Sequence, residues 1–247
     1  MAEITINSHG PRPTTQFHTR TRFSKEAPKV SEKISKVYAY AALAFAVTCA
    51  TAFIAERIGF AATILNLSIH LSPVIAPLIL TAIAINLAIA TIRTPKENTQ
   101  EKHAFFGAFA VFQGLSLSPA VLINPTAFLA ASVATVGVVG GLGALSMTLK
   151  ESFERYEKIM MVALGAICIA SISTLALSGS AALLAHEISL IGGLALFTGL
   201  VVYDTHKARS EAQSPFFDEI NHALNMYLNA INILIRLWTI FAGNQKK

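Results

Sequence analysis

One acidic residue lies where its chemistry would matter. Asp204 directly follows an apolar run, residues 196–203, whereas the other acidic residues lie in hydrophilic stretches or at segment margins. An Asp at the centre of a membrane helix costs roughly 2.5–3.5 kcal/mol, and less near the interface. Two interpretations are open. Asp204 is either an interfacial carboxylate that pairs with Lys207 or reaches water, or a pH-sensitive gate whose surroundings set the pH at which it takes up a proton.

A row of asparagines is the second feature that could do chemistry. Segment 220–242 carries them at spacings of four, four and three residues, in the order Asn221, Asn225, Asn229 and Asn232. This spacing places them along one stripe of a helix. Polar side chains at membrane depth normally face other helices or water rather than lipid. We therefore expect this helix at the centre of a bundle, with a re-entrant or half-crossing segment as the alternative.

The rise of a helix indicates which of these side chains can meet Asp204. If a short turn joins the two segments, Asp204 lies about 9 Å from that turn, Asn225 about 10 Å and Asn229 about 16 Å. We predict that these three residues form the gate or line the pore. His206, two residues beyond Asp204, is a candidate for a supporting position. So is Arg236, although at roughly 27 Å it is too deep for a direct pair in a straight helix.

The elements that carry these residues follow from the distribution of charge. Hydrophobic types make up 53% of the 247 residues and charged types 13%, against roughly a quarter charged in soluble domains. Only Lys158, Asp204 and Arg236 are charged within seven apolar segments, which are 37–55, 74–92, 104–123, 126–149, 158–178, 188–204 and 220–242. A helix needs about 20 mostly apolar residues to cross a bilayer, where unpaired backbone amides find no partner. The sequence therefore predicts an all-α membrane protein with seven transmembrane helices, and disfavours a soluble enzyme or a nucleic-acid binder.

Basic residues between the segments predict the orientation. Residues 1–32 form a basic arm that we expect to be disordered, and residues 33–247 form the membrane domain. Loops rich and poor in Lys and Arg alternate along the chain, so the positive-inside rule places the N-terminus in the cytoplasm. No secretory signal peptide is recognised. We expect the plasma or inner membrane in a bacterium, and the endoplasmic reticulum in a eukaryote.

Small residues and one proline suggest how the helices pack. Gly137 and Gly141 have the small-xxx-small spacing that lets two membrane helices approach closely, so we predict a helix contact there. Pro119 interrupts the third segment, where it would remove a helix hydrogen bond and produce a kink. Such a kink is either purely structural or lines a cavity.

Four stretches, in order along the chain, carry a family resemblance. They are KVYAYAAL from Lys36, FGAFAVFQGLSLSP from Phe106, GLVVYDT from Gly199 and HALNMYLNAINIL from His222. Together they resemble the transmembrane Bax inhibitor motif family, the Bax inhibitor 1-like membrane proteins. The resemblance spans about residues 33–242 and leaves the basic arm outside it.

The resemblance implies a fold and an activity. It implies seven helices with a polar, central last helix, and a pH-dependent calcium leak in which two aspartates share protons and control the opening. Asp204 matches the first of these aspartates. The second falls at Asn229, which cannot titrate, so this chain departs from the paired-acid arrangement.

The favoured function is therefore a pH-modulated calcium or cation leak channel. The alternative is a non-conducting regulator that binds membrane partners, such as cell-death factors or a membrane protease. An intramembrane hydrolase would need a second carboxylate to share a proton with Asp204, so we expect no enzymatic activity and no cofactor. The expected partners are the lipid bilayer, calcium or other cations, and other membrane proteins, with no nucleic acid.

Overall fold

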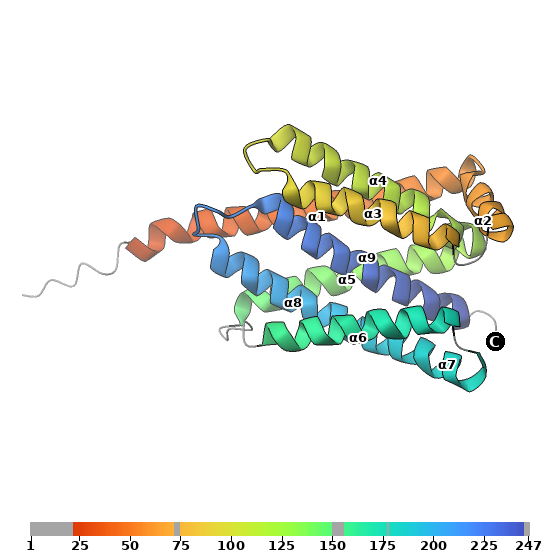
Figure 1. Cartoon of the computed structure of the whole chain (residues 1–247). Coiled ribbons are helices and arrows are strands. Elements are labelled where there is room, and N and C mark those ends of the chain that lie inside the picture. The colour runs from red at the N-terminus through yellow and green to blue at the C-terminus, as the bar shows by residue number, and fades with distance from the viewer. Residues whose placement is uncertain (1–21, 72–74, 150–155, 177, 245–247) are drawn as a thin grey trace, which may run out of the picture.

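Helices make up nearly all of the structure. The computed structural model describes residues 22–71, 75–149, 156–176 and 178–244 (Figure 1). Within these ranges the helices are α1 (Arg22–Arg57), α2 (Phe60–Leu71), α3 (Ile75–Arg93), α4 (Thr99–Ile123), α5 (Pro125–Thr148), α6 (Glu157–Ala176), α7 (Gly179–Glu187), α8 (Gly193–Glu211) and α9 (Glu219–Asn244). A π-turn, Ile188–Gly192, joins α7 to α8. No strand occurs in these ranges, so the predicted all-α class is confirmed.

Seven of the helical stretches are long and apolar enough to cross a membrane. They are Val30–Arg57, Ile75–Arg93, Thr99–Ile123, Pro125–Thr148, Glu157–Thr174, Gly179–Glu211 and Glu219–Gly243. Each contains most of one of the seven predicted segments. The sixth runs through α7, the π-turn and α8, and the seventh is the continuous helix α9 rather than a broken segment. The short apolar helix α2 was not predicted.

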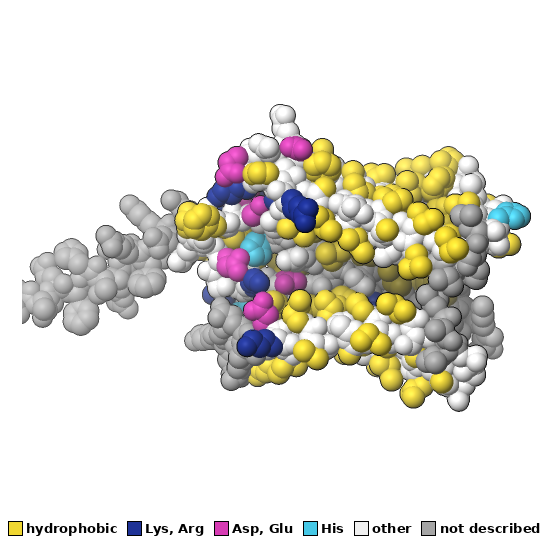
Figure 2. All heavy atoms as spheres, viewed as in Figure 1, with side chains coloured by type: hydrophobic (Ala, Val, Ile, Leu, Met, Phe, Trp, Pro, Cys, Tyr) yellow, Lys and Arg dark blue, Asp and Glu magenta, His cyan; other side chains and the backbone are white. Residues whose placement is uncertain are grey.

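The surface is that of a protein surrounded by lipid. Large apolar side chains are widely exposed along the bundle, for example Ile69 at 75% and Val162 at 74%. Figure 2 shows hydrophobic side chains over the length of the helices, with most of the visible acidic and basic side chains gathered at the end where α1 begins. We call this the charged end, and the other the far end. Apolar side chains exposed on this scale are stable in hydrocarbon and not in water.

Helix α9 lies between the other helices of the bundle (Figure 1). It packs against α1, α3, α4, α5 and α8, and against the π-turn. Its side chains include several that are fully buried, among them Leu224, Tyr227 and Leu234. Because α9 contacts α1, α3 and α4 as well as α5 and α8, it holds the bundle together.

A polar contact lies at the crossing of α1, α4 and α9. The Thr48 hydroxyl is 2.6 Å from the Tyr227 hydroxyl and donates to the Ala110 carbonyl at 2.9 Å. A Cβ built on Gly114 would lie 2.5 Å from the Thr48 carbonyl oxygen, so only glycine allows α1 and α4 to approach this closely. The small side chain and the hydrogen bonds fix the distance between these helices.

A buried ion pair ties the helix ends together at the charged end. Lys102, on the first turns of α4, is 2% exposed and lies 2.6 Å from an Asp218 carboxylate oxygen. The same ammonium group donates to the Thr94 carbonyl at 2.9 Å. Asp218 also caps α9, because its second oxygen accepts from the backbone amides of Ile220 and Asn221. The Lys102–Asp218 pair therefore links the ends of α3, α4 and α9.

The basic arm differs from its prediction at one boundary. Helix α1 begins at Arg22, so residues 22–32 continue the membrane helix instead of being disordered. The Glu32–Lys36 ion pair, at 3.0 Å and one helical turn apart, lies where the predicted arm meets the membrane domain. Residues 1–21 lie outside the described part of the chain.

The predicted close packing at Gly137 and Gly141 is wrong for this bundle. A Cβ built at either position has nothing within 4 Å, so no helix of the described chain approaches them. On the same helix, Gly143 is the glycine in close contact, because a Cβ there would lie 2.6 Å from the Tyr38 ring. The spacing of glycines identifies a face that permits contact, whereas the position of the neighbouring helix decides whether contact is made.

Pro119 lies within α4, which continues to Ile123. Proline has no backbone N–H, so the carbonyl of Leu115 loses its usual helical donor. The Ser118 hydroxyl donates to that carbonyl at 2.7 Å and satisfies it. The predicted interruption is therefore compensated locally, and the helix is not broken.

We predict that Lys102→Met lowers the free energy of unfolding in detergent by about 3–5 kcal/mol, because it leaves the Asp218 carboxylate, which is only 16% exposed, without its counter-charge. Lys36→Met is the matched control, since the Lys36–Glu32 pair has side chains 48% and 66% exposed and should change stability by about 0–1 kcal/mol. Denaturant unfolding of the two variants measures the difference. Equal stability of both would mean that the Lys102–Asp218 pair does not stabilise the helix ends.

Candidate functional site

Asp204 meets α9 through a single short hydrogen bond. Its carboxylate oxygen accepts from the side-chain amide of Asn229 at 2.6 Å. Asp204 is half-buried and Asn229 is 5% exposed. Asp204 lies seven residues before the end of α8, or about 10 Å along the helix axis. The bond therefore joins α8 and α9 inside the membrane-spanning region, near its charged end.

The helices on either side fix the position of Asp204. The hydroxyl of the next residue, Thr205, lies 2.5 Å from that of Tyr38 on α1 and donates to the Val201 carbonyl at 2.7 Å. Two residues before Asp204, the Val202 carbonyl accepts from Ser146 of α5 at 3.1 Å. Contacts with α1, α5 and α9 thus hold this turn of α8 on three sides.

Lys207 does not pair with Asp204. Its ammonium group lies 3.7 Å from a carboxylate oxygen of Glu157 at the start of α6, and both side chains are well exposed. It also lies 5.8 Å from the centre of the Tyr203 ring. The interpretation of Asp204 as an interfacial acid paired with Lys207 is therefore not supported by the structure.

The predicted gate residues do not all come together. Asn229 faces Asp204, whereas Asn225 is exposed and makes no hydrogen bond with Asp204. Asn225 shares a face of α9 with Leu228 and Ile235, which line a groove of about 480 Å³ between α3, α4 and α9. The asparagine row is thus divided, because Asn229 faces Asp204 whereas Asn225 is exposed and is not among the residues that line this groove.

Neither of the two candidates for a supporting position bonds to Asp204. Arg236 donates to the Ser189 carbonyl and to Asn232, and makes no ion pair with Asp204. This agrees with the depth expected from the helical rise. His206 is half-buried on the turn that follows Asp204, and no hydrogen bond between the two side chains is present.

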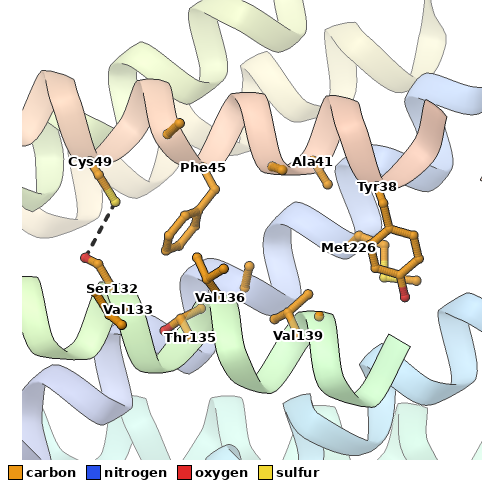
Figure 3. A pocket seen from close by; sticks show the side chains of 14 residues that line it. Tyr38, Ala41, Phe45, Cys49, Ser132, Val133, Thr135, Val136, Val139 and Met226 are labelled. Carbon is orange, nitrogen blue, oxygen red and sulfur yellow. Dashed lines mark hydrogen bonds between the residues drawn. The ribbon is translucent and has the colours of Figure 1, made fainter. Parts of the chain in front are cut away.

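A second cavity lies on the opposite side of α9 (Figure 3). It holds about 410 Å³ between α1 and α5, and Met226 and Ala230 of α9 contribute to its lining. Figure 3 shows Phe45 and Val136 pointing into it, with a contact of 3.6 Å between Cys49 and Ser132 at one end. Because its lining contains no Asp, Glu or His, this cavity is unsuited to holding a cation.

The chemistry available at Asp204 is that of one acid and one amide. When the carboxylate is ionised, the Asn229 N–H donates to it in a charge-assisted bond. When the acid is protonated, its O–H can donate to the amide oxygen, and the bond becomes an ordinary neutral one. Among the described residues no three His, Cys, Asp or Glu side chains lie close enough to hold a metal ion. The site can therefore change charge with pH, but it does not form a resident metal centre in the described chain.

Comparison with known proteins identifies the family. A family model described as "Inhibitor of apoptosis-promoting Bax1" matches residues 30–246. The chain belongs to this family. It is 25% identical to Bax inhibitor 1 of Homo sapiens over 241 residues, covering 93% of both chains. It is 26% identical to Bax inhibitor 1 of Rattus norvegicus over 237 residues, again covering 93% of both. An uncharacterized protein of Deinococcus radiodurans is 26% identical over 230 residues, or 90% of this chain and 94% of that protein.

The family assignment confirms the resemblance drawn from the four stretches. The chain is a multi-pass membrane protein of the Bax inhibitor family. The stretches also contain residues whose part in the site was not foreseen. Tyr38 lies in the first stretch and Thr205 ends the third. Their presence in two of the motifs was a signal from which a contact between α1 and the turn that carries Asp204 could have been predicted. Lys102 and Asp218 lie outside all four stretches and gave no such signal.

We predict that Asn229→Leu lowers the free energy of unfolding by about 1–3 kcal/mol, because it leaves the half-buried Asp204 carboxylate without its donor. A double-mutant cycle with Asp204→Ala, measured by unfolding in detergent, should give a coupling energy of about 0.5–3 kcal/mol. Asn225→Leu is the control, since Asn225 makes no bond with Asp204. Strict additivity of the first pair would show that the hydrogen bond contributes nothing to stability.

Proposed function

We propose that this protein is a pH-modulated leak for calcium or other cations, in which Asp204 controls the opening. The observation that supports this most directly is the bond between Asp204 and Asn229, because it joins two membrane-spanning helices through a group that can change its charge. The family membership adds support, since the resemblance to Bax inhibitor 1-like proteins implies a leak of this kind.

The mechanism follows from the two forms of this bond. The ionised carboxylate binds the Asn229 amide in a charge-assisted bond, which holds α8 against α9 and keeps the path closed. Protonation removes the charge and leaves a neutral bond of roughly half the strength. The contact between the helices then separates more readily, so the leak increases as the pH falls.

The proposed route for the ion runs along α9. Asn225 is exposed and lies three residues before Leu228, which lines the groove that also includes the side chains of Thr81, Gln113 and Ser116. Oxygen atoms of amides and hydroxyl groups are ligands that hard cations accept. In the proposed path, Asn225 receives the ion from this groove, and the Asp204–Asn229 contact closes the way along α9.

We predict that Asp204→Asn makes the leak independent of pH and leaves it near the acidic level of the wild type, because the variant can form only the neutral bond. The measurement is Ca²⁺ entry into liposomes loaded with a calcium indicator, between about pH 5 and 8. Wild-type flux should rise three- to tenfold over this interval, as expected for about 1 kcal/mol at one hydrogen bond.

An absence of flux from the wild type at every pH would overturn the leak. It would favour a second function, that of a non-conducting regulator that binds membrane partners. The face of α5 around Gly137 and Gly141 supports this alternative, because it is exposed and free of contact with other helices of the described chain. Small residues on such a face allow a partner helix to approach closely.

We predict that Asn229→Asp changes the shape of the pH response. A second carboxylate at hydrogen-bonding distance from Asp204 would share a proton with it, and the pair would titrate in two separated steps. The wild type should show one step with a slope of one proton. The control is Asn225→Asp, which adds the same charge to α9 at a position that does not bind Asp204. Two steps in the control as well would show that charge on α9, and not the pair, produces the second one.

A further inference from the structure

A buried arginine lies far from the site at Asp204. Arg236 is on α9 and is 9% exposed. It lies eight residues before the end of the helix, or about 12 Å along its axis, within the membrane-spanning region. An arginine side chain stays protonated in proteins. The bundle therefore carries a full positive charge near its far end.

The chain is built around this guanidinium group. Its Nε donates to the Ser189 carbonyl at 3.1 Å, and its Nη1 donates to the carbonyl of Asn232 at 3.0 Å and to its side-chain oxygen at 3.3 Å. The group lies over the ring of Phe197, 4.7 Å from its centre. These contacts come from α9 itself, from the π-turn and from α8, so three elements enclose one side chain.

The π-turn and a glycine create the space that it fills. Ser189, whose carbonyl accepts from Arg236, belongs to the π-turn Ile188–Gly192. Gly193 follows directly, and a Cβ at that position would collide with the guanidinium nitrogens. π-turns are rare in proteins and are often found at functional sites. Here the irregular turn and the missing side chain both serve to admit the charged group.

All the partners of this group are neutral. No Asp or Glu of the described residues lies within the 4.0 Å of an ion pair with Arg236. Glu187, two residues before Ser189, is exposed and is not paired with it. Carbonyl oxygens and an aromatic face lower the cost of burying a charge but do not cancel it.

One edge of the guanidinium group also lacks acceptors. The hydrogen bonds that it makes within the described chain use Nε and Nη1, and none uses Nη2. Nη2 carries two N–H donors. Because Nη2 is not among the fully buried atoms that lack a partner, this edge of the otherwise buried side chain is accessible to a small ligand. It has the two properties of an anion site, net positive charge and directed N–H groups.

We propose that Arg236 binds one small monovalent anion of the chloride class at the Nη2 edge of its guanidinium group. One negative charge balances the single positive charge, so a divalent anion would leave an excess. A lipid phosphate is disfavoured because Arg236 lies about 12 Å from the end of α9 and turns toward α8 and the π-turn. This inference is independent of the leak, because it concerns binding at a different depth of the bundle.

The test is binding of radioactive chloride to the purified full-length protein in detergent. We expect the wild type to bind one chloride per chain, displaced by bromide, and Arg236→Gln to lose at least tenfold in affinity. Arg209→Gln is the matched control, because Arg209 is an exposed arginine of α8 that donates to the Met147 carbonyl. It should bind as the wild type does. No chloride bound by the wild type, or equal binding by Arg236→Gln, would overturn the proposal.

A second measurement covers the case in which Arg236→Gln does not fold. The melting temperature of the wild type should rise by about 2–4 °C when chloride replaces gluconate at about four times the dissociation constant. Arg236→Lys keeps the charge but loses the forked donors, so its rise should be smaller. An unchanged melting temperature in the wild type would overturn the proposal.

Nanodiscs separate free chloride from a lipid headgroup. In both phosphatidylcholine and phosphatidylglycerol nanodiscs we expect the wild type to bind chloride with the same affinity. If phosphatidylglycerol abolishes chloride binding in the wild type, Arg236 binds the lipid phosphate instead, and the free-anion proposal is wrong. Because these measurements involve no ion flux, their failure is distinguishable from failure of the proposed leak.

Discussion

The organisation of the bundle depends on one constraint, that polar groups at membrane depth must be satisfied by protein atoms. Helix α9 meets it at three depths. Tyr227 bonds to Thr48 of α1, Asn229 bonds to Asp204 of α8, and Arg236 bonds to the π-turn at Ser189. Each bond joins α9 to a different neighbour, so these polar groups hold α9 against α1, α8 and the π-turn. Apolar contacts then fill the space between these fixed points.

Glycines help to meet the same constraint, because they let helices approach closely. Hydrogen bonds of this length require the helices to come close, and a Cβ in the wrong place would prevent it. Gly114 lies against the Thr48 backbone, and Gly193 lies against Arg236, so both are next to a polar contact. Gly137 and Gly141 have no such contact and lie on an open face of α5. Close packing in this chain therefore follows the polar bonds rather than the glycine spacing.

The spans could be predicted because exclusion of charge from hydrocarbon is a local property of each segment. The partner of Asp204 was within reach as well, since the rise of two adjacent helices limits which asparagines can meet it, and Asn229 was among them. The Lys102–Asp218 pair could not be predicted, because it joins helix ends that are 116 residues apart in the sequence. The π-turn and the enclosure of Arg236 could not be predicted either. They depend on how α8 and α9 are rotated relative to each other, and the spacing of residues along one helix does not determine that rotation.

In the proposed leak, an asparagine at position 229 would make the contact with Asp204 a modulator rather than a switch. An amide can donate to an ionised carboxylate and accept from a protonated one, so a bond between α8 and α9 exists in both states. The difference between a charge-assisted and a neutral hydrogen bond is about 1 kcal/mol, which shifts an equilibrium by roughly fivefold. A nearly complete change from closed to open needs about 10⁴-fold. Two acids that repel each other could supply more of this difference, whereas one acid beside an amide adjusts the open fraction over a limited range.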